Sequence, residues 1–175
     1  MAMRSKKKTQ KQNQPPPTRP KPFWETKKLE EMTAEEWESL CDGCAKCCLV
    51  KVQYDNSDMV YYTDLACNLL DIETCRCSDY EHRAELEPSC AILTPQKAHD
   101  FKWLPKTCAY RLIAEGKPLK RWHHLVCGDP ERVHTAGISI RNKVIHEKDI
   151  DPEDLEDHIG KYDEKIRVGH LPKYR

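Results

Sequence analysis

Four cysteines lie within eight residues, from Cys41 to Cys48, in the order Cys-x2-Cys-x2-Cys-Cys. Thiolates this close in sequence need little loop closure to meet, so the entropic cost of assembling a metal centre from them is small. Cys41, Cys44 and Cys47 have the spacing that wraps an iron–sulfur cluster in small ferredoxins, where each two-residue gap turns the next sulfur inward. The stretch therefore predicts a multi-thiolate metal site.

The last cysteine of this run, Cys48, departs from the ferredoxin pattern, which has three spacer residues before a final Cys-Pro. Neighbouring side chains diverge from an extended or turning backbone, so Cys47 and Cys48 are expected to face different ligand sets. Either the two serve separate metal centres, or one of them is not a ligand. One division gives Cys41, Cys44 and Cys47 to one centre and turns Cys48 toward a second.

Six further cysteines follow the opening run. They are Cys67, Cys75, Cys77, Cys90, Cys108 and Cys127. Zinc ribbons and fingers use two separated C-x2-C pairs, and this chain has no second pair of that kind. The spacing thus indicates a multi-thiolate site without specifying zinc. His123 and His124 are weaker ligand candidates, because adjacent imidazoles diverge as adjacent thiols do.

Ten cysteines in 175 residues far exceed ordinary usage and need an explanation. Secreted disulfide scaffolds are usually shorter and follow a signal peptide, whereas residues 1–22 contain no apolar segment. No stretch has the length and apolarity of a membrane span. We therefore expect a reducing, cytoplasmic setting, in which clustered cysteines bind metal rather than form disulfides.

Several short helices are predicted from their end signals. Thr33 and Glu36 have the spacing of a capping box, and Thr94-Pro95 is typical of a helix start. Gly116 would end a helix that carries Cys108 in its first turn, where the helix dipole favours a thiolate. The expected helices span residues 33–40, 94–104, 106–115 and about 152–158.

Segments rich in β-branched and aromatic residues predict strands. Residues 49–54 and 59–63 flank a polar turn and should form a hairpin, and residues 138–145 alternate well enough for a last strand. Residues 122–128 are expected to be loop or edge strand. The fold class predicted is α+β, a small single domain of short helices and strands organised around a multi-cysteine metal centre.

The net charge of zero hides a division along the chain. Residues 1–28 hold nine of the 29 basic residues and only one of the 29 acidic residues, so the remainder is acidic. We expect residues 1–22 to be a disordered, basic, proline-rich tail, 23–160 the cysteine-cluster metal-binding domain and 161–175 a charged tail. The basic tail could make weak contacts with nucleic acid or an acidic partner through its charge.

Three longer segments extend the pattern beyond the opening run. They are Cys75-Arg-Cys-Ser-Asp-Tyr-Glu-His-Arg83, Trp103-Leu-Pro-Lys-Thr-Cys-Ala-Tyr-Arg111 and the stretch from Ile138-Ser-Ile-Arg141 to Glu156-Asp-His-Ile159. Together with residues 41–48 they resemble the bacterial zinc- or iron-chelating cysteine-cluster proteins, and most closely the uncharacterised YcgN-like branch of UPF0260 type. The resemblance covers residues 23–159.

The resemblance implies metal binding through thiolates rather than a particular reaction. Cys127 lies outside the resembling segments, which leaves nine cysteines, one more than two four-thiolate centres require. The implied metal ligands are Cys41, Cys44, Cys47, Cys48, Cys67, Cys75, Cys77, Cys90 and Cys108. No catalytic residue is identified, and whether the protein is an enzyme stays open.

We expect an iron–sulfur cluster ahead of zinc, in a protein of undefined physiological role. One alternative is a zinc-stabilised interaction module, since closed sulfur-only sites suit structural zinc. A similar cysteine-rich domain occurs in flagellin lysine N-methylases, which carry an iron–sulfur cluster, so the resemblance also allows an iron–sulfur-dependent enzyme of that kind.

Overall fold

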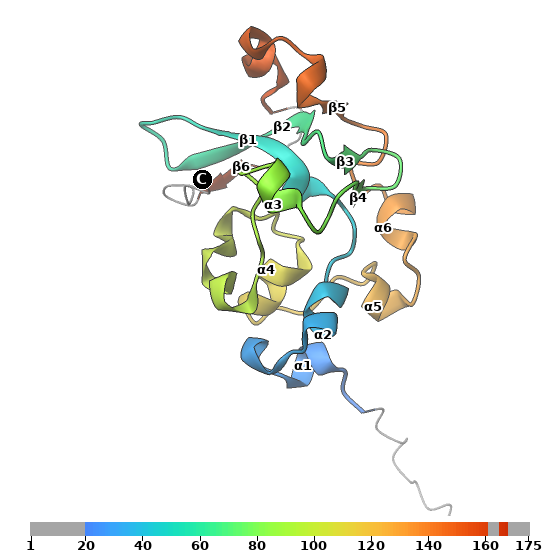
Figure 1. The fold of residues 1–175 in the computed structure, drawn as a ribbon. Coiled ribbons are helices and arrows are strands. Elements are labelled where there is room, and N and C mark those ends of the chain that lie inside the picture. Colours follow the sequence, from blue (N-terminus) through green and yellow to red (C-terminus); the bar gives the residue numbers. More distant parts are fainter. Residues whose placement is uncertain (1–19, 161–164, 168–175) are drawn as a thin grey trace, which may run out of the picture.

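The computed structural model describes residues 20–160 and 165–167, which form a small sheet flanked by short helices (Figure 1). The α-helices are α1 (Phe23–Thr26), α2 (Ala34–Ser39), α3 (Arg83–Leu86), α4 (Ala109–Ala114), α5 (His124–Cys127) and α6 (Arg132–Thr135). The 3₁₀ helices are η1 (Leu29–Glu31), η2 (Lys46–Cys48), η3 (Pro95–Trp103), η4 (Glu147–Asp149) and η5 (Pro152–His158). The strands are β1 (Leu49–Gln53), β2 (Met59–Ala66), β3 (Leu70–Asp71), β4 (Arg76–Cys77), β5 (Ile145–His146) and β6 (Lys165–Arg167). The predicted α+β class is confirmed.

Strand β2 is the centre of the main sheet. It pairs antiparallel with β1, as the predicted hairpin requires, and with β6 along its first three residues, while β5 runs parallel to its last two. A second, two-stranded sheet joins β3 to β4. Strand β6 comes from residues 161–175, the segment expected to be a charged tail.

Helix α2 leads directly into the cysteine run. The Glu36 amide donates to the Thr33 hydroxyl at 3.2 Å, and the Thr33 amide donates to the Glu36 carboxylate at 2.9 Å. This reciprocal pairing confirms the predicted capping box and satisfies two amides that would otherwise lack partners. In Figure 1 the chain passes from α2 up to the β1–β2 hairpin, and the cysteine run makes this connection.

The two helices predicted after residue 94 are present, with different details. The first is the 3₁₀ helix η3, with Pro95 at its first position. The second, α4, begins at Ala109, so Cys108 is its N-cap residue and precedes the first turn. Helix η5 occupies the expected place near residues 152–158 as a 3₁₀ helix.

Two local predictions were wrong. Residues 138–144 form no strand and only Ile145 joins β5, because Asn142 has a φ of 56° and the Ile140 amide donates to the Cys44 carbonyl. Residues 124–127 form the helical turn α5, where a loop or edge strand was expected. The His123 ring accepts the Leu125 amide and Gly128 ends the turn with a φ of 76°, so both ends of the turn are capped.

Two hydrophobic clusters form the core. The first joins α2, η3 and α4 around Trp37, and the second joins the sheet to Ile140. The Tyr62 hydroxyl connects them by donating to the Trp103 carbonyl at 2.6 Å. Cys47 packs against the first cluster and Cys48 against the second, so the cysteine run lies between the two halves of the core.

The predicted disorder and partner contacts of the N-terminal tail concern residues 1–22, and residues 1–19 lie outside the described part of the chain. Within the described ranges, no helix combines the length and the apolar composition needed to cross a bilayer.

Candidate metal centre

A single cavity of about 1000 Å³ brings the predicted ligands together. Its lining includes the thiol-bearing residues Cys41, Cys44, Cys47, Cys48, Cys67, Cys75, Cys77, Cys90 and Cys108. Cys127 is exposed elsewhere, and its thiol contacts the backbone carbonyls of Trp122 and Asp129. All ten cysteines of the chain lie in the described ranges and none is in a disulfide. The nine cysteines that the sequence predicted as metal ligands therefore all lie around this cavity.

The backbone of residues 42–45 turns sharply beside the cavity. Gly43 has a φ of 73° and Ala45 a φ of 59°, and the Cys44 amide donates to the Asp42 carboxylate at 3.0 Å. Left-handed backbone at two positions coils the short segment, so its cysteines share one cavity instead of alternating sides. Asp42 is buried, and its second carboxylate oxygen lacks a hydrogen-bond partner among the described residues.

Cys47 and Cys48 do not diverge as far as the sequence suggested. Both belong to the 3₁₀ turn η2, and their sulfurs lie 3.9 Å apart. A hydrogen bond from the Cys48 thiol lowers the pKa of Cys47, whereas the same contact raises the pKa of Cys48. The pair is therefore suited to hold one negative charge between two touching sulfurs.

The sheet positions Cys67 and Cys77. The Cys67 amide donates to the Cys48 carbonyl at 2.9 Å, just beyond the Leu49–Ala66 pair of β1 and β2. Cys77 ends β4, whose pairing with β3 returns the chain toward Cys67. These contacts place Cys67 beside Cys48 and bring Cys77 back toward Cys67.

Cys108 reaches the cavity from α4. In that helix Tyr110 packs on Trp37 of α2 with ring centroids 4.6 Å apart, and the Trp37 indole donates to the Leu93 carbonyl at 3.0 Å. This aromatic contact joins the helix that precedes Cys41 to the helix that follows Cys108. Packing of the first core cluster therefore sets the distance between these two parts of the site.

Cys75 has a different environment from the other cavity cysteines. It is buried, has a φ of 57° and belongs to the second hydrophobic cluster. Burial raises the pKa of its thiol, and the guanidinium of Arg141 beside it opposes that shift. This is the environment of a thiol that packs in the core, with an arginine nearby.

Lys51 is the basic group that sequence reasoning missed. Its ammonium donates to the carbonyls of Cys47 and Leu49, each at 2.7 Å, and lies 5.0 Å from the ring centroid of Trp103. Desolvation lowers the pKa of Lys51, while the neighbouring thiolates raise it. A half-buried ammonium here would compensate negative charge on the sulfurs.

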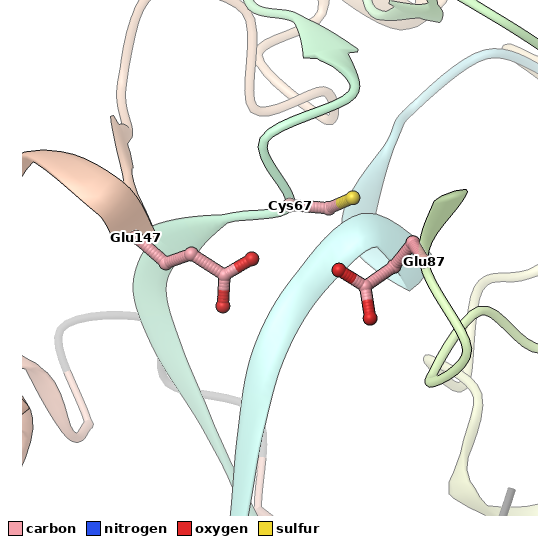
Figure 2. A group of neighbouring side chains, drawn as sticks. All are labelled: Cys67, Glu87 and Glu147. Atoms are coloured by element: carbon pink, nitrogen blue, oxygen red, sulfur yellow. The ribbon is translucent and has the colours of Figure 1, made fainter. Parts of the chain in front are cut away.

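Two carboxylates also reach the cavity. Figure 2 shows Glu87, after α3, and Glu147, at the start of η4, pointing toward the sulfur of Cys67. One ligand atom from each of these three residues lies within 4.8 Å of the others. Burial and then the nearby Glu87 raise the pKa of Glu147. Only folding reveals this group, since its members are up to 80 residues apart.

Burial dominates the acid–base behaviour of the thiols. It raises the pKa of Cys44 and Cys108 well above the ordinary value of 9.0, and nearby acidic groups add to the effect. Cys41 is an exposed residue, but it also lines the cavity. Desolvation of the thiol there raises its pKa to about 12. Without a cation these thiols are therefore protonated at neutral pH, and a metal must displace their protons.

The histidine candidates do not join this site. His123 is fully buried, and its ring accepts the Leu125 amide through Nδ1 and donates to the Leu40 carbonyl through Nε2 at 3.0 Å. Both ring nitrogens are thus used in holding α5 to α2. His124 stacks on His123 and lies outside the cavity lining.

Comparison with known proteins identifies relatives of the whole domain. Residues 40–109 match the family model described as "Putative zinc- or iron-chelating domain". A UPF0260 protein of Pseudomonas putida KT2440 is 54% identical over 138 residues, which are 79% of this chain and 92% of the relative. A UPF0260 protein of Gluconacetobacter diazotrophicus is 51% identical over 154 residues, 88% of this chain and 95% of the relative. No solved structure matches the chain.

Proposed function

The chain belongs to the UPF0260 family, and from that premise we propose that it is a cytoplasmic iron–sulfur protein. The family description names zinc or iron as the chelated metal. The donor set fits either soft metal, because nine thiols line one cavity. The choice between the two metals depends on how these sulfurs are spaced.

The spacing of the sulfurs carries the proposal. Four thiolates on one zinc ion, at bond lengths of about 2.3 Å, must lie about 3.8 Å from one another. Among the described residues, which include every cysteine, no three sulfurs have all their mutual distances within 4.8 Å. A cluster separates its ligands because each thiolate binds a different iron, so widely spaced sulfurs around a roomy cavity favour iron–sulfur.

The charge around the cavity agrees with this choice. Thiolate-bound clusters are anionic, and Lys51 supplies a half-buried cation that acts on the thiols of Cys47 and Cys48. Its hydrogen bonds to backbone carbonyls hold the ammonium in place without using a carboxylate, so its charge remains available to the cluster. When bound, the cluster would supply one-electron redox chemistry.

The test is metal and sulfide analysis of the full chain purified without oxygen, together with a visible spectrum. We expect a brown protein that contains iron and acid-labile sulfide. A colourless protein with stoichiometric zinc and no sulfide would overturn the proposal and make the thiols structural. Cys127→Ser is the matched control, because this thiol lies outside the cavity and its loss should leave the iron content unchanged.

A further inference from the structure

We propose that the cavity holds two separate four-thiolate centres that meet at the Cys47–Cys48 step, an inference that rests on the proposed iron–sulfur function. The first centre would be bound by Cys41, Cys44, Cys47 and Cys108. The second would be bound by Cys48, Cys67, Cys77 and Cys90. Cys75 belongs to neither. This division resolves the excess of one cysteine that the sequence leaves unassigned.

The first set is held by the helical half of the core. Three of its cysteines come from the coiled run after α2, and Cys108 comes from the cap of α4. Trp37 and Tyr110 lock these two helices together, and Cys47 and Cys108 both pack against the same hydrophobic cluster. Cys44 lies close enough to Cys47 and Cys108 for their charges to act on it.

The second set is held by the strands and by the segment after α3. The amide of Cys67 binds the Cys48 carbonyl, and the β3–β4 pair brings Cys77 back beside Cys67. Cys90 follows a turn in which its amide donates to the Glu87 carbonyl at 2.8 Å. The thiol of Cys90 lies near those of Cys67 and Cys77 of its own set, and also near that of Cys47, where the two sets meet.

The boundary between the sets runs through one peptide unit. Cys47 packs against the helical cluster and Cys48 against the sheet cluster, although their sulfurs are only 3.9 Å apart. Lys51 sits at this boundary, where thiols of both sets act on its ammonium. Two anionic centres in contact would repel each other, so a cation between them lowers the cost of holding both.

Cys75 is excluded by its surroundings. The largest charge effects on its buried thiol come from Arg141, Asp71 and Arg76, and the Arg141 guanidinium donates a hydrogen bond to Glu131. Cys75 lies in the hydrophobic cluster of the sheet and has arginines rather than other thiols as its main charged neighbours, so we assign it to the core and not to a centre.

The experiment compares the metal content of single variants, purified without oxygen as full chains. Two four-iron clusters would give the unaltered protein about eight iron and eight sulfide per chain. Cys108→Ser should remove the first centre and Cys90→Ser the second, so each variant should retain about half of the iron and sulfide. Cys75→Ser should retain all of it.

The outcomes separate this inference from the proposed function. Iron that disappears completely in both Cys108→Ser and Cys90→Ser would overturn the division into two centres while leaving an iron–sulfur protein. About four iron per unaltered chain would fit two 2Fe–2S clusters only if each variant still retains half of it. Zinc in place of iron overturns the proposed function, and halving of the zinc in each variant would still support the two ligand sets.

A further variant tests whether the carboxylates complete the second centre. Glu147→Gln keeps the size of the side chain and removes its charge, and we expect it to retain both centres. Loss of half the metal in Glu147→Gln would replace the proposed second set by one containing Cys67, Glu87 and Glu147.

A measurement on the unaltered chain covers the case in which the serine variants do not fold. After reduction, two paramagnetic clusters in contact should give an electron paramagnetic resonance spectrum broadened by coupling between their spins. A simple, uncoupled spectrum that accounts for all the iron would overturn the arrangement.

Discussion

The ammonium of Lys51 donates a hydrogen bond of 2.7 Å to the backbone carbonyl of Cys47, inside the wall of the thiol-lined cavity. Its second bond goes to the Leu49 carbonyl, and the rings of Tyr62 and Trp103 lie over it. Backbone oxygens and aromatic faces stabilise the cation without neutralising it. Lys51 can therefore tune whatever anionic centre the thiols hold.

Lys51→Met should lower the reduction potential of the bound cluster. The substitution removes a positive charge that favours the added electron, and a lost interaction of about 1.4 kcal/mol corresponds to roughly 60 mV for one electron. Potentiometric titration measures the shift. Lys120→Met, which removes an exposed lysine outside the cavity, should leave the potential unchanged. Equal potentials for Lys51→Met and the unaltered protein would contradict a charge effect.

Gly43→Ala should weaken both the fold and metal retention. Gly43 has a φ of 73°, where a side chain costs about 1–2 kcal/mol, although the added Cβ would meet only Arg76 at an ordinary 3.6 Å. Gly116→Ala is the matched control, with a φ of 65°, open space around it and no place in the cavity lining. Both variants should lose stability in thermal denaturation, but only Gly43→Ala should lose iron on dilution.

Cys44→Ser should lose metal and stability together. Cys44 is only 8% exposed. When metal ligands converge in a core, the free energy of metal binding also stabilises the fold, so losing one ligand weakens both. We expect less bound metal than in the Cys127→Ser control and a destabilisation on the order of a few kcal/mol. Full metal content with an unchanged melting temperature would remove Cys44 from the ligand set.

The metal-free protein should become less stable as the pH rises above 9. Burial raises the pKa of Cys44 and Cys108 above their ordinary value of 9.0, so the folded state favours the neutral thiols. The stability that these neutral thiols give to the folded state is complete below pH 9. It is lost as the pH rises through the pKa values that the two thiols have in the folded state. Chemical denaturation of the metal-free chain from pH 7.5 to pH 10.5 measures this.

The loaded protein should respond to pH in the opposite direction. Metal must displace the thiol protons, so metal affinity should fall as the pH falls below 7. Competition with a chelator at several pH values checks this expectation. Affinity that does not change with pH would mean that the ligands are already ionised before the metal binds.

Local sequence signals were enough for several elements near the site. The Thr33–Glu36 capping box and the β1–β2 hairpin depend on contacts between residues close in the chain, and both have the predicted form. The cysteines that line the cavity were also identified from spacing and family resemblance. The prediction of a strand at 138–145 was wrong. The Ile140 amide donates to the Cys44 carbonyl, a contact between distant segments that the alternating pattern of residues could not indicate.

The sequence by itself determined that thiols dominate this protein's chemistry, because the density and spacing of cysteines are local properties of the chain. Only the tertiary structure decided which thiols are neighbours. Cys67 meets Cys48 through strand pairing, and Cys108 approaches Cys44 through the packing of Tyr110 on Trp37. The environments of Lys51 and Cys75 are likewise products of burial, which depends on contacts between distant segments.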